Sequence, residues 1–396
     1  MTGLRGVVRI LGVVKIAILA RILTPAQFGI FGIALLILGL LETLTETGIN
    51  IFLIQEKGST EDYLDSAWVV SILRGTIIAL LILFTVPFVV TFFKSPASAP
   101  LLYLVAGVAF IRGFINPMEV QFQKTLHFKK EFLFQSVLFL VDAGGAIALG
   151  FLTRSESALV YGMLMAAVFE VILSFTVFKK KPKFAFELER IKKVINAGKW
   201  VTGAGTFSYL FQNIDNIVVA RVLGTPSLGL YQQAYRISTL PVSEVGQIFN
   251  KVTFPIFVKI SGEKFRLRVA YIKTLLLVFG LVLPFGLLVI LFSKPIILLI
   301  LGPGWLSIEP ALKVLAVFGI LKSVLNSSYS LFLSLKLQRV VMYSELAGII
   351  GIGALIVPLT TQFGILGASY AALLGSLLSI PVIIYNYPKI FRDEKI

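Results

Sequence analysis

The chain has 396 residues, of which 57% are hydrophobic and only 14% are charged, and its mean hydropathy is +0.93. A soluble domain carries about 25% charged residues, so no soluble fold could bury this much apolar surface. The sequence contains no cysteine, which excludes disulfides, thiolate catalysis and cysteine-based metal sites. We therefore expect an all-α integral membrane protein that crosses the bilayer many times, with no metal and no cofactor.

Apolar runs bounded by turn or charge signals predict twelve spans. In the first half they lie near 3–23, 29–54, 66–92, 101–118, 133–152 and 158–178. In the second half they lie near 195–223, 229–258, 269–292, 308–334, 341–359 and 366–386. The basic stretch between the halves must lie in water or at the lipid headgroups. These boundaries predict an N-terminal lobe over 1–178, a cytoplasmic linker over 179–193 and a C-terminal lobe over 194–396.

The basic residues act as topology signals rather than as a nucleic-acid site, although the formal net charge is +16. If the N-terminus is cytoplasmic, the internal segments hold 20 Lys and Arg residues and the external segments hold 3. Short cationic loops resist translocation, so both chain ends are predicted to lie inside the cell.

The two halves repeat at an offset of 200 residues, because AILARILTPAQFGIF in the first half aligns with IVVARVLGTPSLGLY in the second. Each copy closes the first helix of its half and opens the second. Six spans per half is an even number, so both copies have the same orientation and the repeat is parallel. Two parallel six-helix lobes around a central cavity are typical of a transporter.

Residues 211–260, FQNIDNIVVARVLGTPSLGLYQQAYRISTLPVSEVGQIFNKVTFPIFVKI, closely resemble the polysaccharide transporter family of the MOP flippase superfamily. Within that family, the branch that exports colanic and teichuronic acid repeat units is the most similar, beside the O-antigen flippases. The run ARILTPAQFG in the first half and the GPGW at 302–305 also fit. The resemblance implies a MATE-like fold in the cytoplasmic, or inner, membrane. It also implies a flippase whose substrate headgroup crosses between the lobes while the polyprenyl tail stays in lipid.

The start of the chain departs from this family pattern. Such proteins usually begin with a basic amphipathic stretch before the first span, whereas Met1 aligns with Val201, which is already inside a span. We therefore expect that the native protein starts upstream of Met1 or that the chain is a fragment.

Thirteen basic residues fall inside the spans or at their margins, a costly placement that indicates a wet cavity or a partner. Arg74 and Arg112 have no obvious acidic partner at their depth, and a guanidinium suits phosphate; contacts with headgroups or backbone are the alternative. With Lys15, they are our candidates for the substrate cavity. A polar stripe on the seventh span adds Gln212 and Asn216, which could instead form hydrogen bonds between helices.

Two carboxylates are candidates for proton coupling. Asp142 and Glu170 fall near the middle of the fifth and sixth spans with no basic residue nearby in sequence. A buried carboxylate without a partner takes up a proton, so either group could link transport to proton movement.

Depth matching predicts three ion pairs within the first two helices of each half. Two antiparallel helices joined by a tight turn place residues with a constant index sum at the same height. The pairs are Arg5 with Glu46, Arg9 with Glu42, and Asp215 with Arg236. Lys15 has an apolar residue at its own level and is expected to stay uncompensated. An index sum fixes height and not azimuth, so helices turned away from each other are the alternative.

Together these features predict a transporter that flips a polyprenyl-pyrophosphate-linked oligosaccharide repeat unit from the inner to the outer leaflet. It would work by alternating access around a cationic cavity, for surface polysaccharide or lipopolysaccharide synthesis. The expected partners are the lipid-linked glycan, membrane lipids and the polysaccharide polymerase machinery. A cation-coupled multidrug exporter of the same superfamily is the first alternative and would favour an acidic or aromatic cavity. A membrane-embedded glycan polymerase or ligase is a remote one, because the external loops are short.

Overall fold

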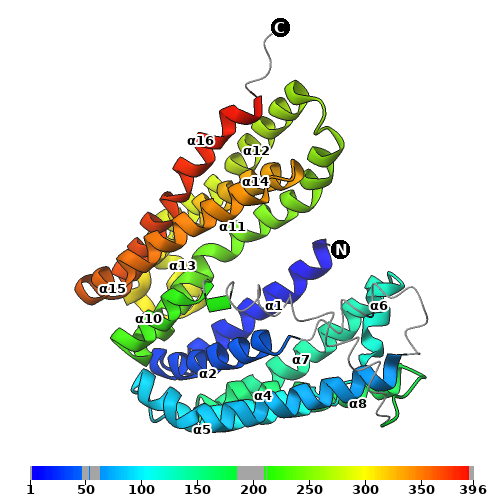
Figure 1. The fold of residues 1–396 in the computed structure, drawn as a ribbon. Coiled ribbons are helices and arrows are strands. Elements are labelled where there is room, and N and C mark those ends of the chain that lie inside the picture. Colours follow the sequence, from blue (N-terminus) through cyan, green and yellow to red (C-terminus); the bar gives the residue numbers. More distant parts are fainter. Residues whose placement is uncertain (1, 47–52, 54–62, 185–208, 211, 392–396) are drawn as a thin grey trace. The chain divides into compact units, whose positions relative to one another are not determined.

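The computed structural model describes residues 2–46, 53, 63–184, 209, 210 and 212–391, with side chains throughout these ranges except at 2–10, 240–248, 250 and 251. Every regular element in this described part is helical (Figure 1). The helices form two compact units, Met1–Asn213 with Gly224–Pro226, and Ile214–Leu223 with Ser227–Ile396. The predicted boundaries of the two lobes and the linker involve residues that the structure does not describe, so they stay a prediction.

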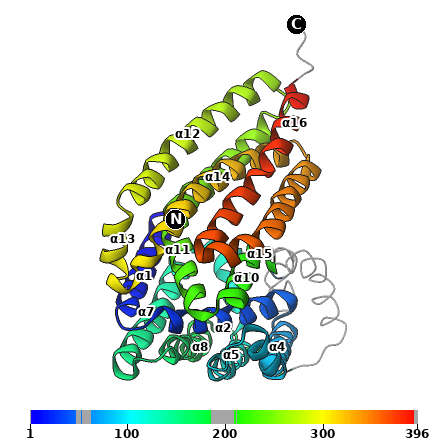
Figure 2. The same cartoon turned by 90° about the vertical axis from the view of Figure 1, so that its left-hand side faces the viewer.

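The first unit is a bundle of long helices, seen partly end-on in Figure 2. Its elements are α1 (Thr2–Ala20), α2 (Pro25–Leu44), α4 (Leu64–Phe93), α5 (Ser98–Arg112), the 3₁₀ turn η2 (Pro117–Val120), α6 (Gln121–Lys124), α7 (Phe128–Thr153) and α8 (Ser157–Val177). Helix α7 packs on α8, α5 packs on α4, α8 and α2, and α1 packs on α7. These contacts bring α2, α4, α5 and α8 around a common interior.

Local sequence fixes where these helices begin and how closely they pack. Thr24 and Gln27 form a capping box at the start of α2, with Pro25 in the first turn. In α8, a Cβ on Gly162 would lie 2.5 Å from the Asp142 backbone oxygen of α7. Only glycine permits that approach, and small residues at such crossings are typical of helix packing in membranes.

The outer faces of the helices are apolar, as a bilayer requires. In α4 the exposed side chains of Leu80, Phe84 and Phe88 follow one another at helical spacing, with 60%, 69% and 64% of their surface accessible. Soluble proteins rarely expose contiguous apolar stripes of this kind. The stripe is therefore a lipid-facing surface.

The second unit begins with α10 (Ile214–Leu223), α11 (Thr225–Lys259) and α12 (Lys264–Leu291). It continues through α13 (Ser293–Ile300), the 3₁₀ turn η3 (Pro303–Ile308), α14 (Glu309–Ser334), α15 (Gln338–Leu377) and α16 (Ser379–Phe391). Helix α14 packs on α12 and α15, and α15 packs on α10 and α16. Serines on α14 face this interior: Tyr271 of α12 shares a hydrogen bond with Ser328 at 2.8 Å.

Six helices in the described ranges are long and apolar enough to cross a membrane, or seven if a bent pair counts as one span. That bent pair differs from the predicted span over 101–118. Helix α5 ends at Arg112, and Pro117–Lys124 turns away from it by 74°. Helix α15 covers the predicted span over 341–359 and the first part of the span over 366–386, whose second part lies in α16. Inside α15, Gly364 breaks the helical conformation with φ 60°. The number of spans and the orientation therefore stay predictions.

Candidate functional site

A polar cavity of about 360 Å³ lies inside the first unit. Helices α2, α4, α5 and α8 line it, together with the bent segment that follows α5 and the start of α7. The ionisable lining residues are Glu42, Glu46, Arg74, Arg112, Glu119, Glu131 and Glu170. Five glutamates and two arginines give the cavity an excess of acidic groups, whereas the sequence led us to expect a cationic one.

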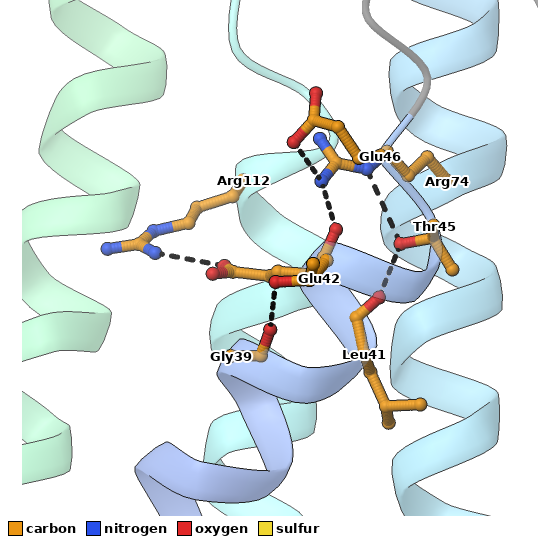
Figure 3. A network of polar contacts seen from close by, with 8 residues as sticks. Gly39, Leu41, Glu42, Thr45, Glu46, Arg74 and Arg112 are labelled. Atoms are coloured by element: carbon orange, nitrogen blue, oxygen red, sulfur yellow. Dashed lines mark hydrogen bonds and ion pairs between the residues drawn. The ribbon is translucent and has the colours of Figure 1, made fainter. Parts of the chain in front are cut away.

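Helix α2 ends at this cavity, and Arg74 of α4 caps it (Figure 3). The Arg74 Nη2 atom donates to the Glu42 backbone oxygen at 2.8 Å and lies 3.5 Å from the Glu46 carboxylate, while Nε donates to Thr45 Oγ1 at 3.4 Å. The last carbonyls of a helix have no partner inside the helix, and a cation stabilises that end of the helix dipole. Arg74 therefore holds the end of α2 in place.

Arg112 is placed differently, at the last residue of α5. Its Nη1 atom lies 3.3 Å from Oε1 of Glu42, and the side chains of the two residues are 40% and 38% exposed. Figure 3 shows the guanidinium extending from α5 to this carboxylate. A guanidinium carries five N–H donors, so most of them stay available to a group that enters the cavity.

These contacts correct the expectation that Arg74 and Arg112 lack acidic partners. Both bond to carboxylates at the end of α2, and Glu42 precedes Arg112 by 70 positions in the chain. Comparing charges along the sequence and within one hairpin could not reveal this, because α2 meets α4 and α5 only through tertiary packing.

The cavity also contains glutamates that sequence reasoning missed. Glu119 follows the bend after α5, and its Oε1 atom is buried without a hydrogen-bond partner. Glu131, in the first turn of α7, accepts a hydrogen bond from Gln123 at 2.8 Å. The Asn116-Pro117 pair was the available signal, because such a pair ends a helix and turns the chain. Glu170, predicted as a coupling group, lines the same cavity from α8.

A third ion pair joins α1 to α7, outside the lining of this cavity. Lys15 Nζ lies 2.6 Å from Oδ2 of Asp142, with the two side chains 13% and 20% exposed. Lys15 was expected to be uncompensated and Asp142 to lack a basic partner, and both expectations are wrong. The two residues are 127 positions apart, so only the packing of α1 on α7 brings them together.

The predicted pairing of Asp215 with Arg236 is also wrong. Asp215 is buried and accepts hydrogen bonds from the Tyr231 hydroxyl at 2.9 Å and from Asn216 at 2.7 and 3.1 Å. Tyr231 precedes Arg236 by five residues, which turns the two side chains about 140° apart around α11. The face of α11 that meets Asp215 is therefore not the face that carries the exposed Arg236.

The remaining predicted residues lie away from the cavity or outside the described side chains. Asn216 is half-buried and bonded to Asp215, and Gln212 is exposed; neither lines the cavity. The predicted pairs of Arg5 with Glu46 and of Arg9 with Glu42 involve arginine side chains that the structure does not describe.

Comparison with known proteins places the chain in a family. Residues 18–310, about three quarters of the chain, match the family described as polysaccharide biosynthesis protein. The lipopolysaccharide biosynthesis protein WzxC of Escherichia coli K12 is 28% identical, over 95% of this chain and 83% of its own length. The teichuronic acid biosynthesis protein TuaB of Bacillus subtilis 168 is 26% identical, over 83% of this chain and 68% of its own.

Two solved structures show the fold. The lipid II flippase MurJ, in an inward closed conformation, superposes with a TM-score of 0.72 at 14% identity, covering 98% of this chain and 88% of MurJ. An inward-facing multidrug resistance MATE transporter of the MOP superfamily gives 0.70 at 16% identity, covering 100% and 96%. The fold confirms the expected resemblance to MOP transporters, and the match over 18–310 establishes that the chain belongs to the polysaccharide biosynthesis protein family.

Proposed function

We propose that the protein flips a polyprenyl-pyrophosphate-linked oligosaccharide repeat unit from the inner to the outer leaflet of the cytoplasmic membrane. The observation that carries this proposal is the family match over residues 18–310, with relatives named for lipopolysaccharide and teichuronic acid biosynthesis. The fold supports it, because a lipid II flippase shares that fold. The protein is a multi-pass membrane transporter and not an enzyme.

The physical requirement for such a protein is a polar path. A pyrophosphate and its sugars cannot cross hydrocarbon unaided, because removing charged groups from water costs many kcal/mol. The protein has to supply water, hydrogen-bond donors and a way to expose the path to each side in turn. The polyprenyl chain can stay in lipid throughout, so only the headgroup needs this path.

Arg112 has the contacts that suit a phosphate-binding role in the first unit. Its pair with Glu42 is a single contact at 3.3 Å between half-exposed side chains, and such pairs contribute about 0 to 1 kcal/mol. A phosphate oxygen could replace the carboxylate at little cost. Arg74 is held by three contacts to the end of α2, so its role in the cavity is to position that helix end.

The carboxylates of the cavity suit a coupling role. An anionic headgroup is repelled by five glutamates unless protons or cations enter with it. Glu170 lines the cavity with Arg112 and is therefore our first candidate for proton uptake. Asp142 would need its pair with Lys15 to open before it could take up a proton. Gln212 and Asn216 remain proposed contacts for the substrate.

The finer architecture is also proposed: twelve spans in two parallel six-helix lobes, with both termini cytoplasmic. The support is the count of 20 internal against 3 external Lys and Arg residues. Reporter fusions at Ser95 and Lys183 should report opposite sides of the membrane. Fusions that report the same side would contradict this topology.

A cation-coupled exporter of organic cations is the second candidate, because the five glutamates of the cavity would suit a positively charged substrate. Gene deletion in a strain without related transporters separates the two. A flippase mutant should accumulate repeat units on their lipid carrier at the cytoplasmic leaflet, before the polymerase machinery can use them. Unchanged surface polysaccharide with a loss of cationic dye efflux would favour the exporter.

A further inference from the structure

A lysine in the second unit stands in the middle of its helix. Lys322 lies 13 residues after the start of α14 and 12 residues before its end, which is about 18 to 20 Å from either end at 1.5 Å per residue. A lysine side chain near a helix end can extend to the headgroups, but one at this depth cannot reach them. The Lys322 side chain is exposed, so its ammonium group needs a water-filled space inside the protein.

The direct neighbours of Lys322 are a hydroxyl group and an aromatic ring. Its Nζ atom donates to the Tyr235 hydroxyl of α11 at 3.3 Å and lies 5.4 Å from the centre of the Phe318 ring. The Tyr235 and Phe318 rings lie 5.9 Å apart, so both are fixed by packing. An aromatic face attracts an ammonium group but carries no net charge.

Four of the other basic residues in or near the predicted spans differ from Lys322 in this respect. Lys15, Arg74 and Arg112 each contact a carboxylate, and Lys313 on the same helix α14 bonds to Glu309 at 2.8 Å. In the described part of the chain, Lys322 has a hydroxyl and a ring as its neighbours and no carboxylate within 4 Å. Asp215 and Glu345 act on this charge from beyond that distance, so the ammonium group forms no direct ion pair that a ligand would have to break.

Two donors converge at this position. Lys322 contributes an ammonium group with further N–H bonds, and Tyr235 contributes a hydroxyl whose own proton can be donated while its oxygen accepts from Lys322. An ammonium group and a hydroxyl about 3 Å apart suit two oxygens of one phosphoryl group. The midplane depth also suits a substrate that crosses the membrane, since transporters of this general architecture bind substrate there.

We propose that Lys322 and the Tyr235 hydroxyl bind a phosphoryl group of the lipid-linked glycan as the headgroup passes the middle of the membrane. This inference rests on the proposed flippase function and names the contact that the second unit makes with the substrate. Phe318 is a positioning residue, because its buried ring holds the ammonium group in place.

The test measures binding of a fluorescent polyprenyl pyrophosphate to the purified full chain in nanodiscs, beside uncharged polyprenol. K322Q should weaken pyrophosphate binding about tenfold or more, the loss expected for one hydrogen bond to a charged group. K322R should retain most of the affinity, Y235F should lose a smaller part, and polyprenol binding should not change. K313Q is the matched control, since it removes a lysine from the same helix, and should bind as the unmodified protein does.

A second measurement covers the case in which K322Q fails to fold. In the unmodified protein, polyprenyl pyrophosphate should protect Lys322, and not Lys313, from acetylation, as read by mass spectrometry. Full pyrophosphate affinity in folded K322Q, or no protection of Lys322, would overturn the proposal. If the unmodified protein neither binds nor flips the lipid, the proposed function itself fails; if it does both and K322Q is unchanged, only this inference fails.

Discussion

The ion pair between Lys15 and Asp142 should contribute measurably to the stability of the first unit. The pair joins α1 to α7 at 2.6 Å, and at least four fifths of each side chain is buried. Asp142 Oδ1 is also buried without a hydrogen-bond partner, so removing Lys15 leaves a carboxylate with no compensation. Breaking a buried ion pair costs about 3 to 5 kcal/mol of folding free energy. Because both side chains keep some exposure, we expect a cost of about 3 kcal/mol for this pair.

A double-mutant cycle measures this contribution. Lys15→Met and Asp142→Leu alone should each destabilise by about 3 kcal/mol, a change of about 150-fold in the ratio of folded to unfolded protein. The double variant should recover most of that loss, because neither charge is left unpaired. Unfolding of the purified protein in mixed micelles, at rising SDS fraction, provides the ratio.

The control for this cycle is Lys313→Met, which breaks the exposed pair with Glu309. The two side chains are 43% and 29% exposed, so the loss should be much smaller than the loss caused by Lys15→Met. If the double variant is as unstable as the worse single variant, Lys15 and Asp142 do not stabilise each other and the reasoning is refuted.

Two further predictions concern the cavity and the packing around it. Glu42→Gln removes the carboxylate that competes with the substrate for Arg112, so affinity for polyprenyl pyrophosphate should rise by up to about fivefold. The control Glu156→Gln changes a glutamate outside the cavity and should leave this affinity unchanged. Equal effects of the two variants would contradict competition between Glu42 and the substrate. Gly162→Ala should destabilise by about 1 to 3 kcal/mol in the same SDS assay, because its Cβ would meet the α7 backbone at 2.5 Å. Gly144→Ala, whose Cβ would meet nothing within 4 Å, should not destabilise, and similar losses for the two would show that this close contact is unimportant.

The sequence was sufficient to predict the features that depend on neighbouring residues. Hydropathy alone indicated long apolar helices such as α4 and α12, and the Thr24-Pro25 pair marked the start of α2. The quoted motifs also identified the family. These features depend on residues close together in the chain, and they survive in any packing of the helices.

Ion pairs between residues far apart in the chain could not be predicted from the sequence. The partners of Arg112 and Lys15 lie 70 and 127 positions away, and helix order gives no azimuth. Index sums placed Asp215 and Arg236 at one height. Tyr231 and Arg236 point about 140° apart around α11, however, and Tyr231 is the residue that contacts Asp215. Predicting these pairs needs the packing of helices that are distant in sequence.

The acidic cavity was missed for a related reason. Glu119 lies just beyond a predicted span, in what looked like a connecting loop, yet the 74° bend after α5 carries it into the bundle. Treating 101–118 as one straight span overlooked the Asn116-Pro117 signal. Charge inventories of spans alone therefore overstated the positive character of the first unit.

Flipping by the purified protein tests the central claim most directly. Vesicles containing the full chain and a fluorescent polyprenyl-pyrophosphate oligosaccharide would be treated with an impermeant quencher. We predict that inner-leaflet lipid becomes accessible faster than in protein-free vesicles, while the glycan stays chemically unchanged. Accessibility equal to that of protein-free vesicles, or a glycan that is lengthened or transferred, would contradict the account.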